Sequence, residues 1–240
     1  LVEIIPDIRR SILTYGLSAD SQVSAQNISH TESESTFQVI KDEYILGEIS
    51  INVPGKHNVA NSLASVTLGL ELGIPFSVIS RGIQSYSGVK RRFEIKGTYH
   101  DVMVVDDYAH HPTEVRATLD AAKDGWNRRI IAVFQPHLFT RTRDFYQDFA
   151  DSFSIADILI VTKIYPSREE PIDGVSGEMV VHAAQEKNHP QPLYIKEWEH
   201  LMNSLDELVK PGDMVITIGA GNIWRFCQEY FKHLSAKSNL

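Results

Sequence analysis

Five short apolar runs in the second half of the chain constrain its fold more than any other feature of the sequence. They span residues 102–106, 129–134, 157–162, 192–195 and 213–219, and several are nearly continuous in Val, Ile, Leu and Met. Such runs are typical of parallel strands buried on both faces. The segments between them are long enough for the helical crossovers that a parallel sheet requires. The pattern predicts a doubly wound α/β fold with a mostly parallel sheet.

The first part of the chain shows a different pattern. Residues 36–41 and 44–53 alternate polar and apolar side chains, which predicts an antiparallel hairpin with one solvated face. Two helices are expected after this hairpin. The first begins after Gly55 and ends at Gly73, a residue suited to the left-handed position that closes helices, and the second opens at Pro75.

The change between the two patterns falls at residues 86–92. It predicts two domains, residues 1–88 and 89–240, and a chain of 240 residues is long enough to bury two cores. Residues 93–100 precede the first apolar run and predict one antiparallel strand at the edge of the parallel sheet.

Charge and apolar content exclude several classes of protein. With 31 acidic and 23 basic residues, a formal net charge of -8 and no basic stripe, the chain is not expected to bind nucleic acid. No apolar run approaches the roughly 18 to 20 residues of a membrane span, and the start lacks a signal peptide and reads as a cut into a longer chain. The lone Cys227 is expected as a small apolar filler on a helix, which fits a reducing cytoplasm.

Polar and charged side chains follow four of the apolar runs at the point where each run ends. The loops are DDYAHHPTE at 106–114, QPHLFTRTR at 135–143, KIYPSREEP at 163–171 and GAGN at 219–222. Ligands of open parallel sheets bind beyond the carboxyl ends of the strands, so these loops are expected to meet at one edge. Their acids, histidines and arginines predict a site for an anionic substrate with several functional groups.

Simpler interpretations of the first loop stay open. Asp107, His110 and His111 could suggest a metal site, but adjacent histidines point in different directions and no further ligand stands at a recognisable spacing. No metal site is therefore predicted. Asp106 could cap the turn before the helix that Pro112 opens, and one of the two histidines is expected to be structural.

The second and fourth loops also have simpler interpretations. Arg141 and Arg143 could form a solvated face. Thr140 and Thr142 alternate with them at the start of a helix, however, where anions are favoured. GAGN suggests a dinucleotide turn, but Trp224 stands at the third glycine position and the motif follows the last strand, so the nicotinamide signal is weak.

Four motifs in this order resemble the Mur ligase family: GKHNVANSLA at 55–64, GVKRRFE at 88–94, DDYAHHPTEV at 106–115 and FQPHLFTRTRDF at 134–145. The resemblance covers essentially the whole chain, and the double histidine before Pro-Thr-Glu is similar to the branch that adds L-alanine. Family members of this type have three domains. The resemblance implies that residues 1–88 are the last part of the central ATPase domain and residues 89–240 the carboxy-terminal Rossmann-like domain.

The resemblance also implies what this chain lacks. The amino-terminal domain for the UDP-sugar is missing and no G-x-x-x-x-G-K-[ST] phosphate loop occurs, because Gly55, Lys56 and His57 lack the upstream glycine and the terminal hydroxyl residue. The magnesium ligands are expected upstream too. The chain alone is therefore predicted not to hydrolyse ATP, and its partners are the missing amino-terminal and central domains of the same enzyme.

The implied reaction is the ligation of L-alanine to UDP-N-acetylmuramate, with ATP and Mg²⁺, in peptidoglycan precursor synthesis. The γ-phosphoryl group passes to the muramyl carboxylate, and the alanine amine attacks the resulting acyl phosphate. This activation is needed because a carboxylate is a poor electrophile until its oxygen becomes a good leaving group. Catalysis is then mostly charge neutralisation and positioning.

Several residues match positions to which the family gives a role in nucleotide binding. Asn58 and Asn61 match a pair that contacts the adenine side, and a spacing of three places them on one helix face; a helix cap is the alternative for Asn58. Arg92 matches an arginine that reaches the terminal phosphates, whose oxygens suit a planar guanidinium. Asp107 matches an aspartate near the ribose hydroxyls. Together with His137, Arg92 and Asp107 are the catalytic residues that the resemblance implies.

His137 and Arg141 match the loop that meets the amino acid and the muramyl product, and a guanidinium is the natural partner of the alanine carboxylate. His110 and His111 lie beside them, with His110 assigned to the nucleotide and His111 to the substrate. Which of the two faces the ligand stays open. Phe139 stands where a tyrosine is more usual, which affects a single hydroxyl contact.

Three alternatives remain at this point. One is the cell-wall recycling ligase that attaches a ready-made murein peptide to the same UDP-sugar. The others belong to different classes, a nicotinamide-dependent dehydrogenase and a non-catalytic nucleotide-binding module. An early glycine fingerprint with an acid about 20 residues further on would mark the dehydrogenase, and neither feature is present.

Overall fold

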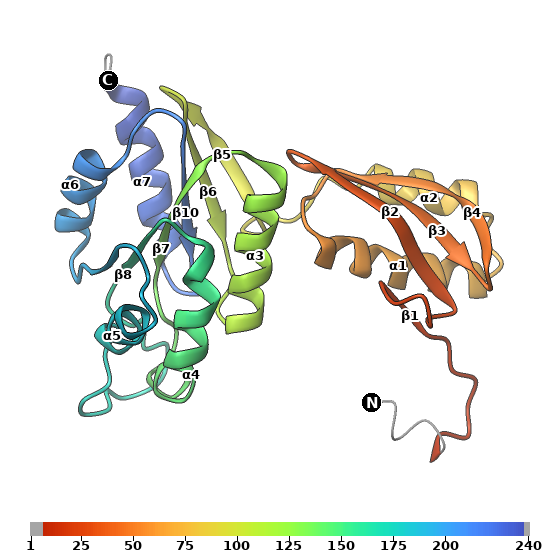
Figure 1. Cartoon of the computed structure of the whole chain (residues 1–240), viewed down its shortest axis with the longest axis horizontal. Helices are drawn as coiled ribbons and strands as arrows, with labels where there is room; N and C mark the ends of the chain where they lie inside the picture. Colours follow the sequence, from red (N-terminus) through yellow and green to blue (C-terminus); the bar gives the residue numbers. More distant parts are fainter. Residues whose placement is uncertain (1–6, 238–240) are drawn as a thin grey trace. The chain divides into compact units, whose positions relative to one another are not determined.

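The computed structural model describes residues 7–237, which form two compact units with the boundary between Ser87 and Gly88 (Figure 1). The division expected from the sequence differs from this boundary by one residue. Each unit has its own sheet, its own helices and its own core, and each is described separately. No helix within residues 7–237 combines the length and the apolar character needed to cross a membrane.

The first unit is built on a four-stranded sheet of order β1-β2-β3-β4. The strands are β1 (Tyr15–Gly16), β2 (Val23–Thr31), β3 (Glu34–Lys41) and β4 (Tyr44–Ile51). β1 pairs with β2 in parallel, and the other pairs are antiparallel. The predicted hairpin is confirmed as β3 and β4. It closes through Asp42 and Glu43, whose φ angles of 47° and 72° are of the kind that two-residue hairpin turns use.

Two helices, α1 (Lys56–Glu71) and α2 (Phe76–Gln84), complete the first unit. Val59, Leu63 and Val66 recur at the spacing of one helix face and are fully buried. They pack with Ile79 of α2 and with the inward side chains of the strands into one core. The predicted bounds of α1 and the predicted start of α2 agree with the structure within one or two residues, whereas β1 and β2 were missed.

The second unit contains a six-stranded sheet of order β5-β6-β10-β7-β8-β9. The strands are β5 (Glu94–Tyr99), β6 (Val102–Asp107), β7 (Arg129–Phe134), β8 (Ile158–Val161), β9 (Pro192–Tyr194) and β10 (Asp213–Ile218). All neighbours are parallel except β5, which runs antiparallel to β6 at one edge. The predicted fold class and the predicted edge strand are both confirmed.

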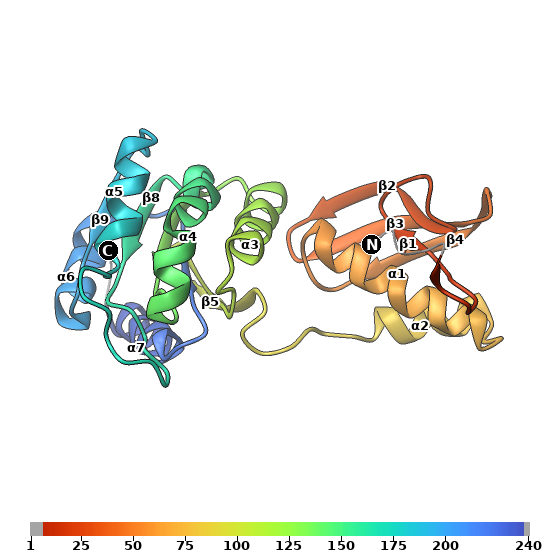
Figure 2. The same cartoon turned by 90° about the horizontal axis from the view of Figure 1, so that it is seen from below.

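Helices cover both faces of this sheet (Figure 2). They are α3 (Pro112–Gly125), α4 (Phe139–Ser152), α5 (Glu178–Glu186), α6 (Trp198–Leu208) and α7 (Ile223–Ala236), with a short 3-10 turn at Phe153–Ile155. Side chains of α3, α4 and α5 form one core with Ile130 and Ala132 of β7, while α6 and α7 form the other with Ile131 and Val133. Alternate residues of one strand thus enter opposite cores, which explains why the run at 129–134 is apolar throughout.

Candidate functional site

The loops at the carboxyl edge of the six-stranded sheet are joined to one another by backbone hydrogen bonds. The N–H of Gly219 donates to the carbonyl of Asp107 at 3.0 Å, and the N–H of Gln135 donates to Ile218 at 2.9 Å. The loops after β7 and β8 continue their pairing through an isolated bridge between His137 and Tyr165. The four loops singled out in the sequence therefore form one connected rim on this unit.

Asp107 ends β6, and its carboxylate holds two backbone segments. Oδ2 accepts the N–H of Phe93 at 2.6 Å and Oδ1 accepts the N–H of Ala109 at 2.7 Å. The side chain is 5% exposed, and this burial raises the pKa of its carboxyl even though the two N–H groups lower it. Asp107 thus fixes the segment that follows the boundary between the units.

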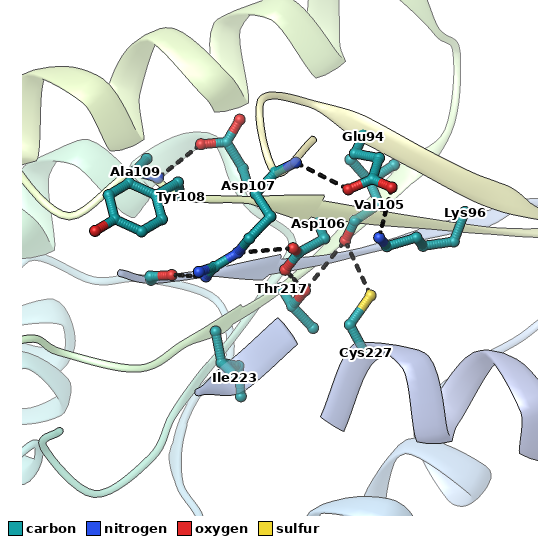
Figure 3. Close-up of polar contacts among 12 residues, drawn as sticks. Glu94, Lys96, Val105, Asp106, Asp107, Tyr108, Ala109, Thr217, Ile223 and Cys227 are labelled. Carbon is teal, nitrogen blue, oxygen red and sulfur yellow. Dashed lines mark hydrogen bonds and ion pairs between the residues drawn. The ribbon is translucent and has the colours of Figure 1, made fainter. Parts of the chain in front are cut away.

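Asp106 lies on the opposite face of β6, in the polar cluster drawn in Figure 3. Its Oδ1 accepts the Thr217 hydroxyl at 2.7 Å and its Oδ2 accepts Nε of Arg91 at 3.2 Å. The carboxylate is fully buried, and burial raises its pKa. The interpretation of Asp106 as a helix cap is wrong, because alternation along the strand turns it away from α3. Cys227 is buried beside the same cluster, which raises the pKa of its thiol to about 12.

Two adjacent arginines behave differently at the start of this unit. Arg91 adopts a left-handed φ of 62°, and its Nη2 donates to the carbonyl of Gly219 at 2.6 Å in addition to its bond to Asp106. Arg92 is exposed and forms no ion pair with a carboxylate among residues 7–237. Both guanidinium groups lie over the ring of Tyr108, at 4.7 Å for Arg91 and 5.7 Å for Arg92. Arg91 is therefore anchored, whereas Arg92 remains available for a ligand.

The two adjacent histidines take different positions, as expected. His111 is the N-cap of α3: its Nδ1 accepts the N–H of Thr113 at 3.3 Å, and Glu114 returns a bond to the His111 N–H. Its ring lies against Phe145, 5.2 Å between centroids. The ring of His110 instead lies 6.0 Å from that of His137. His111 is thus the structural histidine, and His110 is the one that shares a neighbourhood with His137.

His137 lies at the centre of the polar groups on this rim. Nη1 of Arg141 lies 3.3 Å from its Nδ1, and the ring of Tyr165 stacks on it at 5.8 Å. The pKa of His137 is lowered, first by burial and then by the positive charges of Arg141 and His110. Its imidazole is therefore neutral at pH 7, with Nδ1 as the acceptor and Nε2 as the remaining donor.

Side-chain hydrogen bonds of Gln135 hold the GAGN loop in place, so the loop does not form a ligand-binding turn. Oε1 of Gln135 accepts the N–H of Ile223 at 3.1 Å, and its Nε2 donates to Asn222 at 2.9 Å. A Cβ on Gly221 would lie 2.6 Å from the Tyr165 ring, so only glycine fits there. This loop closes the rim by close packing. Sequence reasoning missed Gln135 and Tyr165, although the place of Gln135 directly after β7 and of Tyr165 in the loop after β8 was a usable signal.

Asn58 and Asn61 belong to the first unit, where both line a cavity of about 590 Å³ formed between α1 and α2. Gly55 is the N-cap of α1, so the alternative of Asn58 as the cap is wrong. Its Nδ2 instead donates to the carbonyl of Pro54 at 2.7 Å. Asn61 is exposed, and its side chain forms no hydrogen bond within residues 7–237. The predicted site residues are thus divided between the two units.

The described residues contain no cluster suited to a metal ion. Within residues 7–237, no group of three or more His, Cys, Asp or Glu side chains is arranged to hold a metal ion. Both carboxylate oxygens of Asp107 accept backbone N–H groups, and Nδ1 of His111 accepts the N–H of Thr113. The two side chains therefore do not form a shared set of metal ligands. The rim instead presents donors, namely the guanidinium group of Arg141 and the Nε2 of His137, and Arg92 lies beside it over the ring of Tyr108.

Two family profiles match the chain. That of the Mur ligase glutamate ligase domain matches residues 91–221, and that of the Mur ligase middle domain matches residues 2–69. The chain is 46% identical over 227 residues to a UDP-N-acetylmuramate–L-alanine ligase of Geotalea uraniireducens (strain Rf4), covering 94% of this chain and 49% of that protein. It is 44% identical over 232 residues to the protein of the same name from Salinibacter ruber (strain DSM 13855 / M31), covering 96% and 49%.

Solved structures agree with these matches. UDP-N-acetylmuramate-alanine ligase MurC from Thermotoga maritima has a TM-score of 0.79 and 27% identity, over 94% of this chain and 48% of that one. MurF ligase from Thermotoga maritima in complex with ADP has a TM-score of 0.74 and 17% identity, over 99% and 52%, a likeness of fold alone. The chain spans about half the length of the relatives it matches.

The second unit is an α/β domain whose rim collects cationic and imidazole donors, as domains that handle anionic substrates do. The chain belongs to the Mur ligase family, and the resemblance seen in its motifs is confirmed.

Proposed function

We propose that this chain is part of an ATP-dependent ligase that joins L-alanine to UDP-N-acetylmuramate through an acyl phosphate, in peptidoglycan precursor synthesis in the cytoplasm. The observation that carries the proposal is the geometry of the rim, where Arg141 contacts a neutral His137, while Arg92 lies over Tyr108 on the same unit. Relatives over 40% identical along nearly the whole chain bear the name of such a ligase. As these relatives are about twice as long, the amino-terminal and remaining central domains are the expected partners.

We propose a nucleotide contact on each unit, taken by itself. Asn61, with Asn58 behind it, lines the cavity between α1 and α2 and offers an amide to the adenine edge. Arg92 forms no ion pair within the described residues, although its charge acts on Asp107 and Glu114, and it offers a planar guanidinium to the terminal phosphates. The Mg²⁺ that accompanies ATP takes its ligands mostly from outside this chain. Asp107 acts by fixing the backbone beside Arg92 rather than by direct contact with the reacting atoms.

We assign the amino-acid contacts to the rim. Arg141 binds the carboxylate of L-alanine, and the Nε2 donor of His137 faces the muramyl product and the developing charge. His110 lies beside His137 and is the histidine that faces the ligand, while His111 supports α3. A neutral imidazole suits this place because it donates a hydrogen bond without adding a third positive charge.

The experiment that tests the proposal uses the full-length enzyme from the same gene. We expect phosphate release only when ATP, Mg²⁺, UDP-N-acetylmuramate and L-alanine are all present. Equal phosphate release without L-alanine would contradict the proposal. Turnover with a murein peptide in place of L-alanine would instead favour the recycling ligase. To a solved murein peptide ligase from Psychrobacter arcticus 273-4 this chain has a likeness of fold alone, with a TM-score of 0.63 and 24% identity.

A further inference from the structure

Helix α4, which carries Arg141, begins without a cap from its own sequence. Its N-cap is Leu138, which has a left-handed φ of 74° and no side chain able to accept a hydrogen bond. The first N–H groups of any helix need acceptors from outside the helix. Here the acceptor is Glu169, from the loop after β8: its Oε2 takes the N–H of Thr140 at 3.0 Å, and its Oε1 takes the Thr140 hydroxyl in a short hydrogen bond.

The loop that carries Glu169 is fastened to the same segment at a second point. The N–H of Tyr165 donates to the carbonyl of Pro136 at 2.8 Å, and the N–H of Leu138 donates to the carbonyl of Tyr165 at 3.0 Å. A turn closed by the Glu169 N–H on the Pro166 carbonyl then brings the carboxylate to Thr140. Residues 136–140 are thus held by hydrogen bonds at both ends, from Tyr165 at one end and from Glu169 at the other.

Residues 136–140 contain His137 and are followed directly by Arg141. His137 lies just before the N-cap of α4 and Arg141 lies four residues later in its first turn, so their 3.3 Å contact depends on where α4 starts. Four groups from three loops face the His137 ring: Arg141 on α4, His110 after β6, and Tyr165 and Glu169 after β8. Glu169 is the one carboxylate among them.

We propose that Glu169 is a positioning residue, which caps α4 from the neighbouring loop and thereby holds the His137–Arg141 pair in the geometry that receives the amino acid. The receipt of the amino acid by this pair rests on the proposed function, whereas the capping of α4 by Glu169 does not. Glu169 also occupies the anion position at the start of α4. The sequence predicted that an anion would be favoured at this helix start. The carboxylate of Glu169 is that anion, so the substrate carboxylate is left to Arg141.

The first test uses this chain and no substrate. Glu169→Gln keeps the shape but removes the charge, and Glu169→Ala removes the cap; Glu170→Gln alters an exposed neighbour and is the matched control. We expect amide exchange at Thr140 to accelerate about five- to tenfold in Glu169→Ala, as loss of a helix cap predicts. Unchanged exchange at Thr140 in both Glu169 variants would overturn the capping. If Glu169→Ala fails to fold, Glu169→Asp takes its place: its carboxylate is one methylene shorter, and exchange at Thr140 should accelerate in the same direction.

A second readout on the same chain is the NMR titration of His137. The negative charge of Glu169 raises the pKa of this ring, against Arg141 and His110, which lower it. Glu169→Gln should therefore shift the His137 midpoint to lower pH, while Glu170→Gln leaves it in place. An unshifted midpoint would mean that Glu169 does not act on the pair.

The final test uses the full-length enzyme. Glu169→Gln should raise KM for L-alanine about tenfold, roughly the effect of weakening one charge-assisted hydrogen bond, with KM for ATP unchanged. An equal rise in both KM values would overturn the positioning role. If the capping tests succeed and the wild-type enzyme does not use L-alanine, the proposed function fails while the capping role of Glu169 stands.

Discussion

Nη1 of Arg141, in the first turn of α4, donates toward Nδ1 of His137, four residues earlier, across 3.3 Å. A guanidinium has no acceptor, so His137 must present a lone pair at Nδ1 and carry its proton on Nε2. The contact therefore selects both the charge and the tautomer of the histidine. It also leaves the remaining N–H groups of Arg141 without a carboxylate partner within the described residues.

The first prediction concerns the titration of His137. Its pKa is lowered by burial first and by Arg141 second, so the midpoint measured by NMR should fall below the ordinary value of about 6.5. Arg141→Ala removes the charge and opens the site, and both changes should raise the midpoint. Arg143→Ala is the control, because Arg143 is exposed and pairs with Asp144. A His137 midpoint above that of an exposed histidine would contradict the geometry.

The same shift has a consequence for stability. Folding disfavours the protonated form of His137, so its neutral form is the one that the folded state stabilises. This contribution is fully present above the unfolded pKa of about 6.5 and is lost as the pH falls below it towards the folded pKa. Replacement of His137 by Asn should flatten the dependence of unfolding free energy on pH in that window, as urea titrations at several pH values would show.

The second prediction compares the adjacent carboxylates Asp106 and Asp107. Asp107→Asn should lower the unfolding free energy by about 1–3 kcal/mol, because its new NH₂ group must face one of the two buried N–H donors. Asp106→Asn should cost less, since its oxygen can still accept from Arg91 while its NH₂ donates to the Thr217 hydroxyl. Urea unfolding of the two variants measures the difference. The reverse order would show that the ion pair with Arg91 dominates.

Much of the second unit could be predicted from its sequence. β7 has the predicted bounds, and the other strands begin or end within one or two residues of them, because doubly buried strands leave continuous apolar runs. In the first unit β1 and β2 were missed, and β2 shows the reason most clearly. Its segment, VSAQNISHT, is mostly polar and contains Asn27 with φ of 53° at a register shift, so its pairing is fixed by β3 rather than by an apolar pattern of its own.

The candidate site was predictable in position but not in detail. The rule that ligands lie beyond the carboxyl ends of strands identified the rim and its loops. It could not tell that Arg91 faces the sheet while Arg92 faces solvent, because a left-handed φ at Arg91 sets that choice. Nor could it find Glu169, which reaches Thr140 across a gap of 29 residues in sequence. Contacts made by side chains across loops leave no periodic signal.

The third prediction separates the two asparagines of α1. Asn58→Ala removes the bond to the Pro54 carbonyl and should lower the unfolding free energy by about 1 kcal/mol. Asn61→Ala removes an exposed side chain and should change it by less than about 0.5 kcal/mol. In the full-length enzyme, Asn61→Ala should still raise KM for ATP several-fold. If Asn61→Ala lowers stability and leaves KM for ATP unchanged, Asn61 has a structural role and does not contact the nucleotide.

The last prediction sets Arg92 against Arg91 in the full-length enzyme. Arg92→Ala should lower kcat by about 100-fold or more, the scale at which a single charge-stabilising donor acts in catalysis, with little change in the melting temperature. Arg91→Ala should instead destabilise the fold. It leaves the fully buried Asp106 carboxylate without the Arg91 guanidinium and the Gly219 carbonyl without its donor, which should lower the unfolding free energy by about 1–3 kcal/mol. Thermal melts and initial rates on both variants separate the roles. If Arg92→Ala retains full turnover, the terminal phosphates are held by groups outside this chain, and the exposed guanidinium has no part in the chemistry.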